Sequence, residues 1–137
     1  MEGLAVLVAL NGAVVLLVTG LTGVILARTI HVKASSEHWH LLHAGGTSRG
    51  VMLLALASTI RLAALPEAHL WWIAALIVFF VWTSVLAMLL RALSHEKGFH
   101  PGGPWSNRMV FGLYACGTLA LCIGLPWFIA GLLRALA

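Results

Sequence analysis

Histidines are the residues of this sequence whose type and spacing could do chemistry, because few other side chains are polar or charged. There are seven, namely His31, His38, His40, His43, His69, His95 and His100. An isolated histidine near a helix end is usually structural or solvated, and four of the seven are of this kind. The segment His38-Trp39-His40-Leu41-Leu42-His43 differs, because on a helix Trp39 and His43 lie one turn apart and His40 and His43 share a face.

Two kinds of metal centre fit this segment. One metal ion could bind His40 and His43 together, but the sequence has no HExxH or CxxC motif and no carboxylate within the apolar runs to serve as a third ligand. Haem iron, by contrast, accepts a single histidine ligand. The spacing therefore favours haem over a zinc or copper ion.

The helix surface around His43 is almost without side chains. Gly46, Thr47 and Gly50 lie within roughly 60° of His43 on a helix that turns ~100° per residue. Such a face suits a GxxxG-type contact with another helix, and it equally suits a flat macrocycle whose iron binds His43. Arg49 points elsewhere, but its long side chain could reach a haem propionate, a substrate oxygen or a lipid phosphate.

Membrane-spanning helices must position these residues. Of the 137 residues, 61% are hydrophobic and 9% are charged, and runs such as 4–27 and 70–90 are apolar on all sides, as lipid-facing helices are. The eight Lys and Arg residues stand at the ends of these runs rather than in a basic patch, so we expect no nucleic-acid partner. The sequence predicts an all-α integral membrane protein, a single-domain bundle of four transmembrane helices.

The predicted spans cover about 4–27, 36–65, 67–91 and 105–134. The second starts at Ser36 as N-cap and stops before Pro66, which with Glu67 opens the third. Its length of ~45 Å at 1.5 Å per residue exceeds the ~30 Å hydrocarbon core. We therefore expect its first two turns, with the histidine segment, at the membrane interface or above it. Glycine and proline predict a loop over 94–104.

Positive charges predict the orientation in the membrane. The first and third loops and their flanks hold Arg28, Lys33, Arg91, Lys97 and Arg108, whereas the opposite side holds Arg61 and Arg134. By the positive-inside rule we expect both termini outside and loops 28–35 and 94–104 in the cytoplasm, with a bacterial inner membrane as the location. Asn11 in the first span is expected to bond a neighbouring helix or line a cavity.

In two stretches the sequence resembles the styrene oxide isomerases, small four-span membrane proteins that bind haem b between the subunits of a trimer. Trp39-His40-Leu41-Leu42-His43-Ala44-Gly45, followed by Gly50-Val51-Met52, is similar to the family's Trp-x-x-x-His-x-Gly and Gly-Met segment. The second stretch is Trp82 followed, sixteen residues on, by Gly98-Phe99 and then Gly102. The landmarks need no gap between them, and the resemblance covers most of the chain.

The resemblance implies a haem b cofactor with His43 as its axial ligand. The ferric haem would act as a Lewis acid on an epoxide oxygen, and a 1,2-hydride shift would give a carbonyl compound. His43 would then serve catalysis through the iron, with Arg49 as a second candidate catalytic residue. The partners implied are further copies in a homotrimer, the lipid bilayer and a small hydrophobic substrate. The residues expected to bind the cofactor are His43, Trp39, Gly46, Thr47, Gly50 and Arg49.

The sequence departs from the family pattern in the substrate pocket. The pattern has an Asn six residues after the axial histidine, and an acid and a Tyr on either side of the third-span Trp; this chain has Arg49, Phe80 and Met88. A second hypothesis is therefore a haem-binding membrane sensor or electron carrier without isomerase activity, whose iron binds a further histidine. The candidates are His31, His38, His95 and His100. A third is a structural subunit without cofactor, whose glycine faces only pack.

Overall fold

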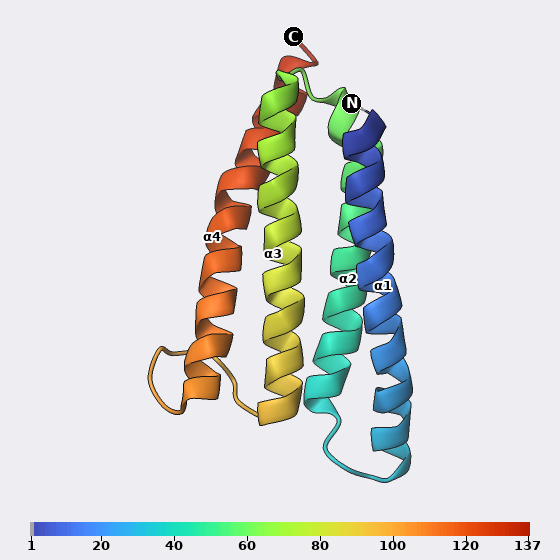
Figure 1. Ribbon diagram of the computed structural model, residues 1–137, viewed down its shortest axis with the longest axis vertical. Coiled ribbons are helices and arrows are strands. Elements are labelled where there is room, and N and C mark those ends of the chain that lie inside the picture. The colour runs from blue at the N-terminus through green and yellow to red at the C-terminus, as the bar shows by residue number, and fades with distance from the viewer. Residues whose placement is uncertain (1) are drawn as a thin grey trace.

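The computed structural model describes residues 2–137, which form four long helices and no strand. The helices are α1 (Glu2–His31), α2 (Glu37–Thr59), α3 (Glu67–Ser94) and α4 (Trp105–Arg134), and a short 3-10 helix, η1 (Ile60–Leu62), follows α2. Successive helices are antiparallel, so the α1–α2 and α3–α4 loops lie at one end and both termini lie at the other (Figure 1). The predicted all-α class and the order of four helices are confirmed.

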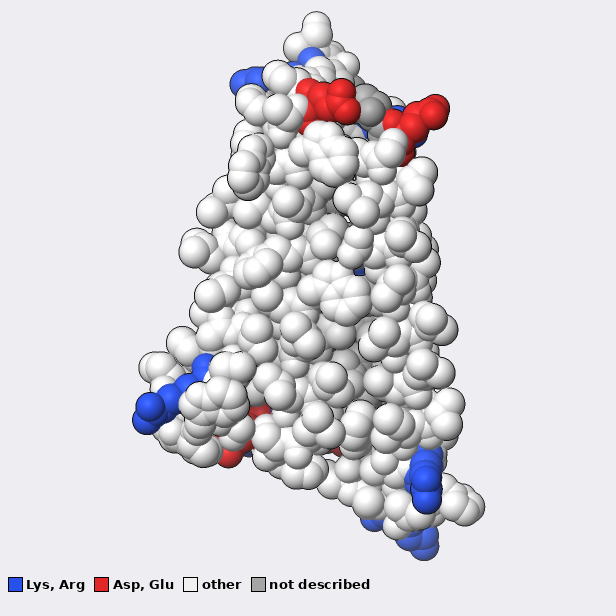
Figure 2. All heavy atoms as spheres, viewed as in Figure 1, with Lys and Arg blue, Asp and Glu red and all other residues white. Residues whose placement is uncertain are grey.

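The surface of the molecule is that of a membrane protein. Three helices, α1, α3 and α4, are long and apolar enough to cross a membrane. The α2 helix is not among these candidates; it carries Glu37 and three histidines in its N-terminal half and Arg49 near its centre. Large apolar side chains point outward, with Val24 71% and Leu119 64% exposed, and charged side chains gather at the two ends (Figure 2). Lipid is the solvent that accepts such a surface.

The α2 helix ends earlier than the sequence predicts. After Thr59 the chain tightens into η1, and at Ala63 it is extended, with φ −75° and ψ 123°. Pro66 disfavours a helical conformation at the residue before it, and the N–H of Ala64 donates to the carbonyl of Gly131 on α4 at 3.0 Å. The predicted end near Leu65 was therefore wrong. With 23 residues, α2 is ~35 Å long at 1.5 Å per residue and is not overlong for a ~30 Å hydrocarbon core.

Glycines allow the helices to pack as two close pairs. Between α1 and α2, a Cβ added to Gly12 would lie 3.0 Å from the carbonyl oxygen of Gly50. Between α3 and α4, a Cβ added to Gly124 would lie 3.1 Å from the Cβ of Leu76. In lipid, where apolar side chains gain nothing by leaving the solvent, such close backbone contacts are a main source of helix association.

The two pairs meet where α2 packs on α3, in a core that includes the buried Leu53, Val81 and Met88. A polar bond joins α1 to α3 as well, since Nε1 of Trp82 donates to Oδ1 of Asn11 at 2.9 Å. This confirms the expectation that Asn11 bonds a neighbouring helix. The α2 helix thus packs against α1 on one side and against α3 on another. These contacts fix its rotation about its own axis, and with it the directions in which His43 and Arg49 point.

Candidate functional site

His43 lies on the side of α2 that faces α1, where its ring is held from two directions. Nδ1 is 2.8 Å from the carbonyl oxygen of Thr19, and the ring lies so close to Gly23 that an added Cβ there would be 2.9 Å from Cε1. A carbonyl oxygen can only accept a hydrogen bond, so Nδ1 must carry the proton. In the neutral imidazole the lone pair is then on Nε2, which is left to bind a metal.

Thr19 is itself held firmly in α1. It is fully buried, its Oγ1 donates to the carbonyl of Val15 at 2.8 Å, and its own carbonyl also accepts from Oγ1 of Thr22 at 2.6 Å. The acceptor that orients His43 is therefore a rigid part of the helix. Neither Thr19 nor Gly23 is identified as a site residue from the sequence, because α1 is apolar on all sides and does not show which face meets α2.

The glycine face of α2 is filled by α1 rather than left open. Gly46 lies against the methyl group of Thr19, and a Cβ added to Gly50 would be 2.7 Å from Cγ of Leu16. Of the two interpretations of this face, the structure supports the helix contact. The expectation that Gly46 and Gly50 bind a macrocycle is not met in this chain, because α1 needs that space for its close approach to α2. Thr47 Oγ1 donates to the carbonyl of His43 at 2.7 Å.

The bare surface beside His43 belongs to α1 instead. Gly20 is exposed, and within the described chain a Cβ added there would meet no atom within 4 Å. It lies three residues before Gly23, on a neighbouring part of the helix surface. Trp39, one turn before His43 on α2, is partly buried against the core. A partly exposed imidazole therefore stands next to a strip of α1 that lacks side chains.

Arg49 points toward α3 and not toward the side of His43. Its guanidinium carbon lies 5.5 Å from the centroid of the Phe80 ring, and Nη1 donates to the carbonyl of Gly45 at 2.9 Å. Met88 is adjacent, since a Cβ added to Gly45 would be 2.8 Å from its sulfur. The structure thus brings Arg49 together with Phe80 and Met88, the other two departures from the family pattern, and does not place it beside His43 of the same chain.

Comparison with known proteins identifies the family. A family model described as styrene oxide isomerase matches residues 4–133. The chain belongs to the styrene oxide isomerase family. No curated protein matches the chain significantly, and no solved structure does. The matched range contains His43 and Arg49 and runs from the first turn of α1 to the last turn of α4, so the resemblance predicted from two short stretches is confirmed over nearly the whole chain.

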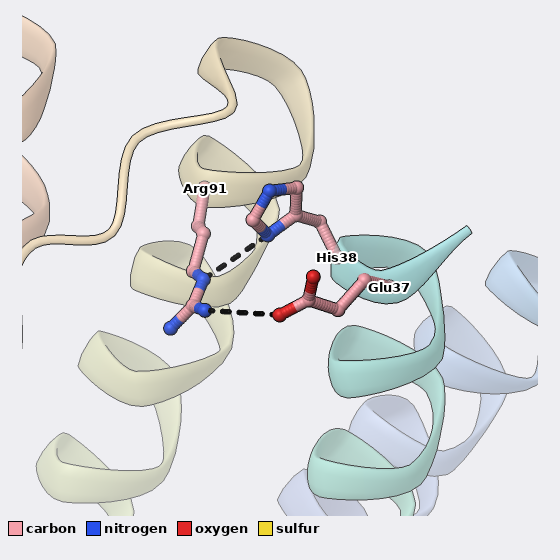
Figure 3. Close-up of polar contacts among 3 residues, drawn as sticks. All are labelled: Glu37, His38 and Arg91. Carbon is pink, nitrogen blue, oxygen red and sulfur yellow. Dashed lines mark hydrogen bonds and ion pairs between the residues drawn. The ribbon is translucent and has the colours of Figure 1, made fainter. Parts of the chain in front are cut away.

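This member of the styrene oxide isomerase family has a second polar cluster at the loop end, between α2 and α3 (Figure 3). Nε of the buried Arg91 donates to Nδ1 of His38 at 3.1 Å, and Nη2 lies 3.9 Å from Oε1 of Glu37. The His38 ring also lies 5.6 Å from that of His95. In residues 2–137 no three His, Cys, Asp or Glu side chains are grouped to hold a metal ion. The cluster anchors the first turn of α2, one turn before the His43 site.

Proposed function

We propose that this chain is a membrane haem b protein that isomerises an epoxide to a carbonyl compound, with His43 as the axial ligand of the iron. The observation that carries the proposal is the hydrogen bond from Nδ1 of His43 to the carbonyl of Thr19. Histidines that bind metals commonly donate their other N–H to a backbone carbonyl or a carboxylate, which fixes the tautomer and the ring orientation. Membership of the styrene oxide isomerase family supports the reaction.

A ferric haem on His43 would supply a Lewis acid for the epoxide oxygen, and Lewis acids of this kind stabilise a transition state by several kcal/mol. The chain itself has two tasks. It holds the imidazole in one orientation through Thr19 and Gly23, and it keeps the site within an apolar surface that excludes water. No water or external electron is needed, because the product is an isomer in which a hydride has moved from one epoxide carbon to the other.

The exposure of the His43 site favours a homo-oligomer as the working form. The His43 ring is partly exposed and lies against Gly23 of α1, and Gly20, about one turn before Gly23, is exposed. A flat macrocycle there would contact this chain on one face only, and a second copy would cover the other. We therefore propose that the working form is the trimer implied by the family resemblance, with the cofactor between copies.

We also propose that α2 is a fourth span. Its length suits a bilayer, and it lies along α1 over most of its course (Figure 1). Five of the eight Lys and Arg residues stand at the end that holds the two loops. This asymmetry supports a cytoplasmic position for loops 28–35 and 94–104, with both termini outside a bacterial inner membrane.

The reaction is tested with purified protein, loaded with haem b, in lipid nanodiscs. We expect the ferric protein to convert styrene oxide to its aldehyde isomer, measured by gas chromatography, and reduction of the iron to suppress the conversion. A low-spin spectrum of bis-histidine type without aldehyde formation would support the sensor or electron carrier instead. Protein that binds no haem at all would rule out both and favour the structural subunit.

Replacing Gly23 by alanine should disturb the orientation of His43. The added methyl would meet the imidazole at 2.9 to 3.1 Å, and crowding of this kind costs about 1–3 kcal/mol. We expect haem affinity, measured by titration of the Soret absorbance, to fall about tenfold or more. Gly112→Ala is the matched control, because it too adds a methyl to a helix but meets no described atom within 4 Å. Equal affinities in the two variants would show that Gly23 does not position the ligand.

A further inference from the structure

A cavity on the α3–α4 pair lies apart from the residues discussed so far. Its volume is 460 Å³, within the range of about 300–1,000 Å³ that is typical of small-molecule sites. All the residues that line it belong to α3 and α4, and Arg49, Phe80 and Met88 are not among them. The cavity is therefore separate from the His43 site and from the positions at which the chain departs from the family pattern.

The walls of this cavity suit an apolar chain. The buried Thr83 uses its hydroxyl within α3, where Oγ1 donates to the carbonyl of Phe79 at 2.8 Å, and the thiol of Cys116 behaves as a small apolar group. The α4 wall is bare at Gly112, where an added Cβ would meet no described atom within 4 Å. Because Phe79 is 49% and Met109 38% exposed, the space is open to the surrounding lipid.

The cavity has the depth of one leaflet of the bilayer. Its α4 residues run from Trp105, the first residue of the helix, to Cys116, which corresponds to ~16 Å of helix at 1.5 Å per residue. Half of a ~30 Å hydrocarbon core is ~15 Å, and Cys116 stands before the midpoint of α4. The exposed Trp105 is of the residue type that is enriched at the membrane interface. The space therefore extends from the interface inward, as an acyl chain does.

A positive charge stands at the loop end of the cavity. Arg108 lines it three residues after Trp105, and its Nε donates to the carbonyl of Gly103 at 3.1 Å. This bond fixes the side chain and leaves the two terminal nitrogens to bind a ligand. Arg108 forms no ion pair within residues 2–137. A guanidinium in this state matches the oxygens of a phosphate, which it can bind through two parallel hydrogen bonds.

We propose that this cavity binds a phospholipid with an anionic headgroup, with its phosphate on Arg108 and one acyl chain along Gly112. None of the described residues that line the cavity is acidic, so the ammonium group of a zwitterionic headgroup would find no partner there, whereas an anionic headgroup needs none. The site depends neither on haem nor on His43. It requires only that α4 crosses the membrane, for which its length and composition suffice.

Native mass spectrometry of the purified full-length chain tests the site, after detergent exchange with equal amounts of phosphatidylglycerol and phosphatidylcholine. We expect each chain to retain one phospholipid, with about a fivefold preference for phosphatidylglycerol, as one arginine near a lipid surface gives. Arg108→Gln should lose this preference and keep a bound lipid. Gly112→Leu fills the space of the acyl chain and should lower the retention of both lipids by about tenfold, as overpacking gives.

The controls make the same two changes outside the cavity. Arg134→Gln removes an exposed arginine at the other end of α4. Gly3→Leu adds the larger side chain at an exposed glycine of α1, where an added Cβ would likewise meet no described atom within 4 Å. Both variants should retain phosphatidylglycerol as wild type does.

Three results would overturn the site. One is the absence of a preference in wild type, another is a preference that persists in Arg108→Gln, and the third is lipid retention that Gly112→Leu leaves unchanged. If Gly112→Leu leaves the lipid in place but dissociates an oligomer, a second copy of the chain occupies the cavity instead. Circular dichroism checks that the variants fold, and Arg108→Gln, which changes an exposed side chain, keeps the test decisive if Gly112→Leu does not. Soret absorbance and aldehyde formation report on the His43 site separately.

Discussion

The His43→Ala variant is expected to be colourless under conditions in which wild type shows a Soret band. His43 is the side chain in this chain whose free Nε2 follows from a fixed hydrogen bond at Nδ1. Its loss removes the iron ligand itself. Since mutation of groups that merely support a metal ligand already costs 10–100-fold in affinity, we expect a loss of at least about 100-fold. Titration with haem b, followed by absorbance of the ferric and the ferrous protein, measures the affinity.

His40→Ala is the control for this experiment, because His40 is exposed on the same helix three residues earlier. It should keep the band. Free imidazole added to the His43→Ala variant should restore it in part, since it can occupy the space that the side chain leaves against Gly23. A structural role alone predicts no rescue. A Soret band of normal intensity in His43→Ala, without imidazole, would disprove the assignment.

The second large effect is expected at Asn107, which holds the α3–α4 loop in shape. This side chain is 2% exposed; its Oδ1 accepts from the N–H of Gly98 at 2.8 Å, and its Nδ2 donates to the carbonyls of His100 and Gly102 at 2.9 and 2.7 Å. Asn107→Ala loses three hydrogen bonds of about 1 kcal/mol each and leaves a buried N–H unpaired. We expect the free energy of unfolding to fall by about 3–4 kcal/mol, as measured by denaturant titration in detergent micelles.

The loop should also open to protease in this variant, so that limited proteolysis cuts between α3 and α4 faster than in wild type. Arg108→Ala is a suitable comparison, because Arg108 is an exposed neighbour whose Nε donates to the carbonyl of Gly103 at 3.1 Å. Its cost should stay within about 0.5 kcal/mol. If both variants unfold and cleave like wild type, Asn107 does not stabilise the loop.

Much of the fold follows from the sequence because its signals are local. Apolar runs, the Pro66-Glu67 start of α3 and the glycines and prolines of the α3–α4 loop each act over a few residues, and the helices begin and end close to where these signals stand. The end of α2 is the exception. It depends on the backbone hydrogen bond between Ala64 and Gly131, which are 67 residues apart in the chain. No local sequence pattern near Thr59 predicts this helix end.

The candidate site was likewise predictable only where the signal lies within one helix. Residue type and spacing single out His43, and the helical angle correctly places Arg49 in another direction. What fills the face around Gly46 and Gly50 was not predictable, because α1 is apolar all round and offers no stripe that would show which side meets α2. Thr19 and Gly23 were missed for this reason. The prediction of an isomerase centre at His43 stays a prediction.

The contact between Gly12 and Gly50 bears on how the chain enters the membrane. A helix with three histidines and a central arginine is a poor candidate for insertion by itself, since arginine at a helix centre alone costs about 2.5–3.5 kcal/mol in insertion experiments. The α1 helix has no such central arginine, and its Gly12 packs closely against the backbone of Gly50 in α2. The two helices should therefore enter the bilayer together as a hairpin, and a variant that weakens their contact should fail during biosynthesis, before any cofactor is bound.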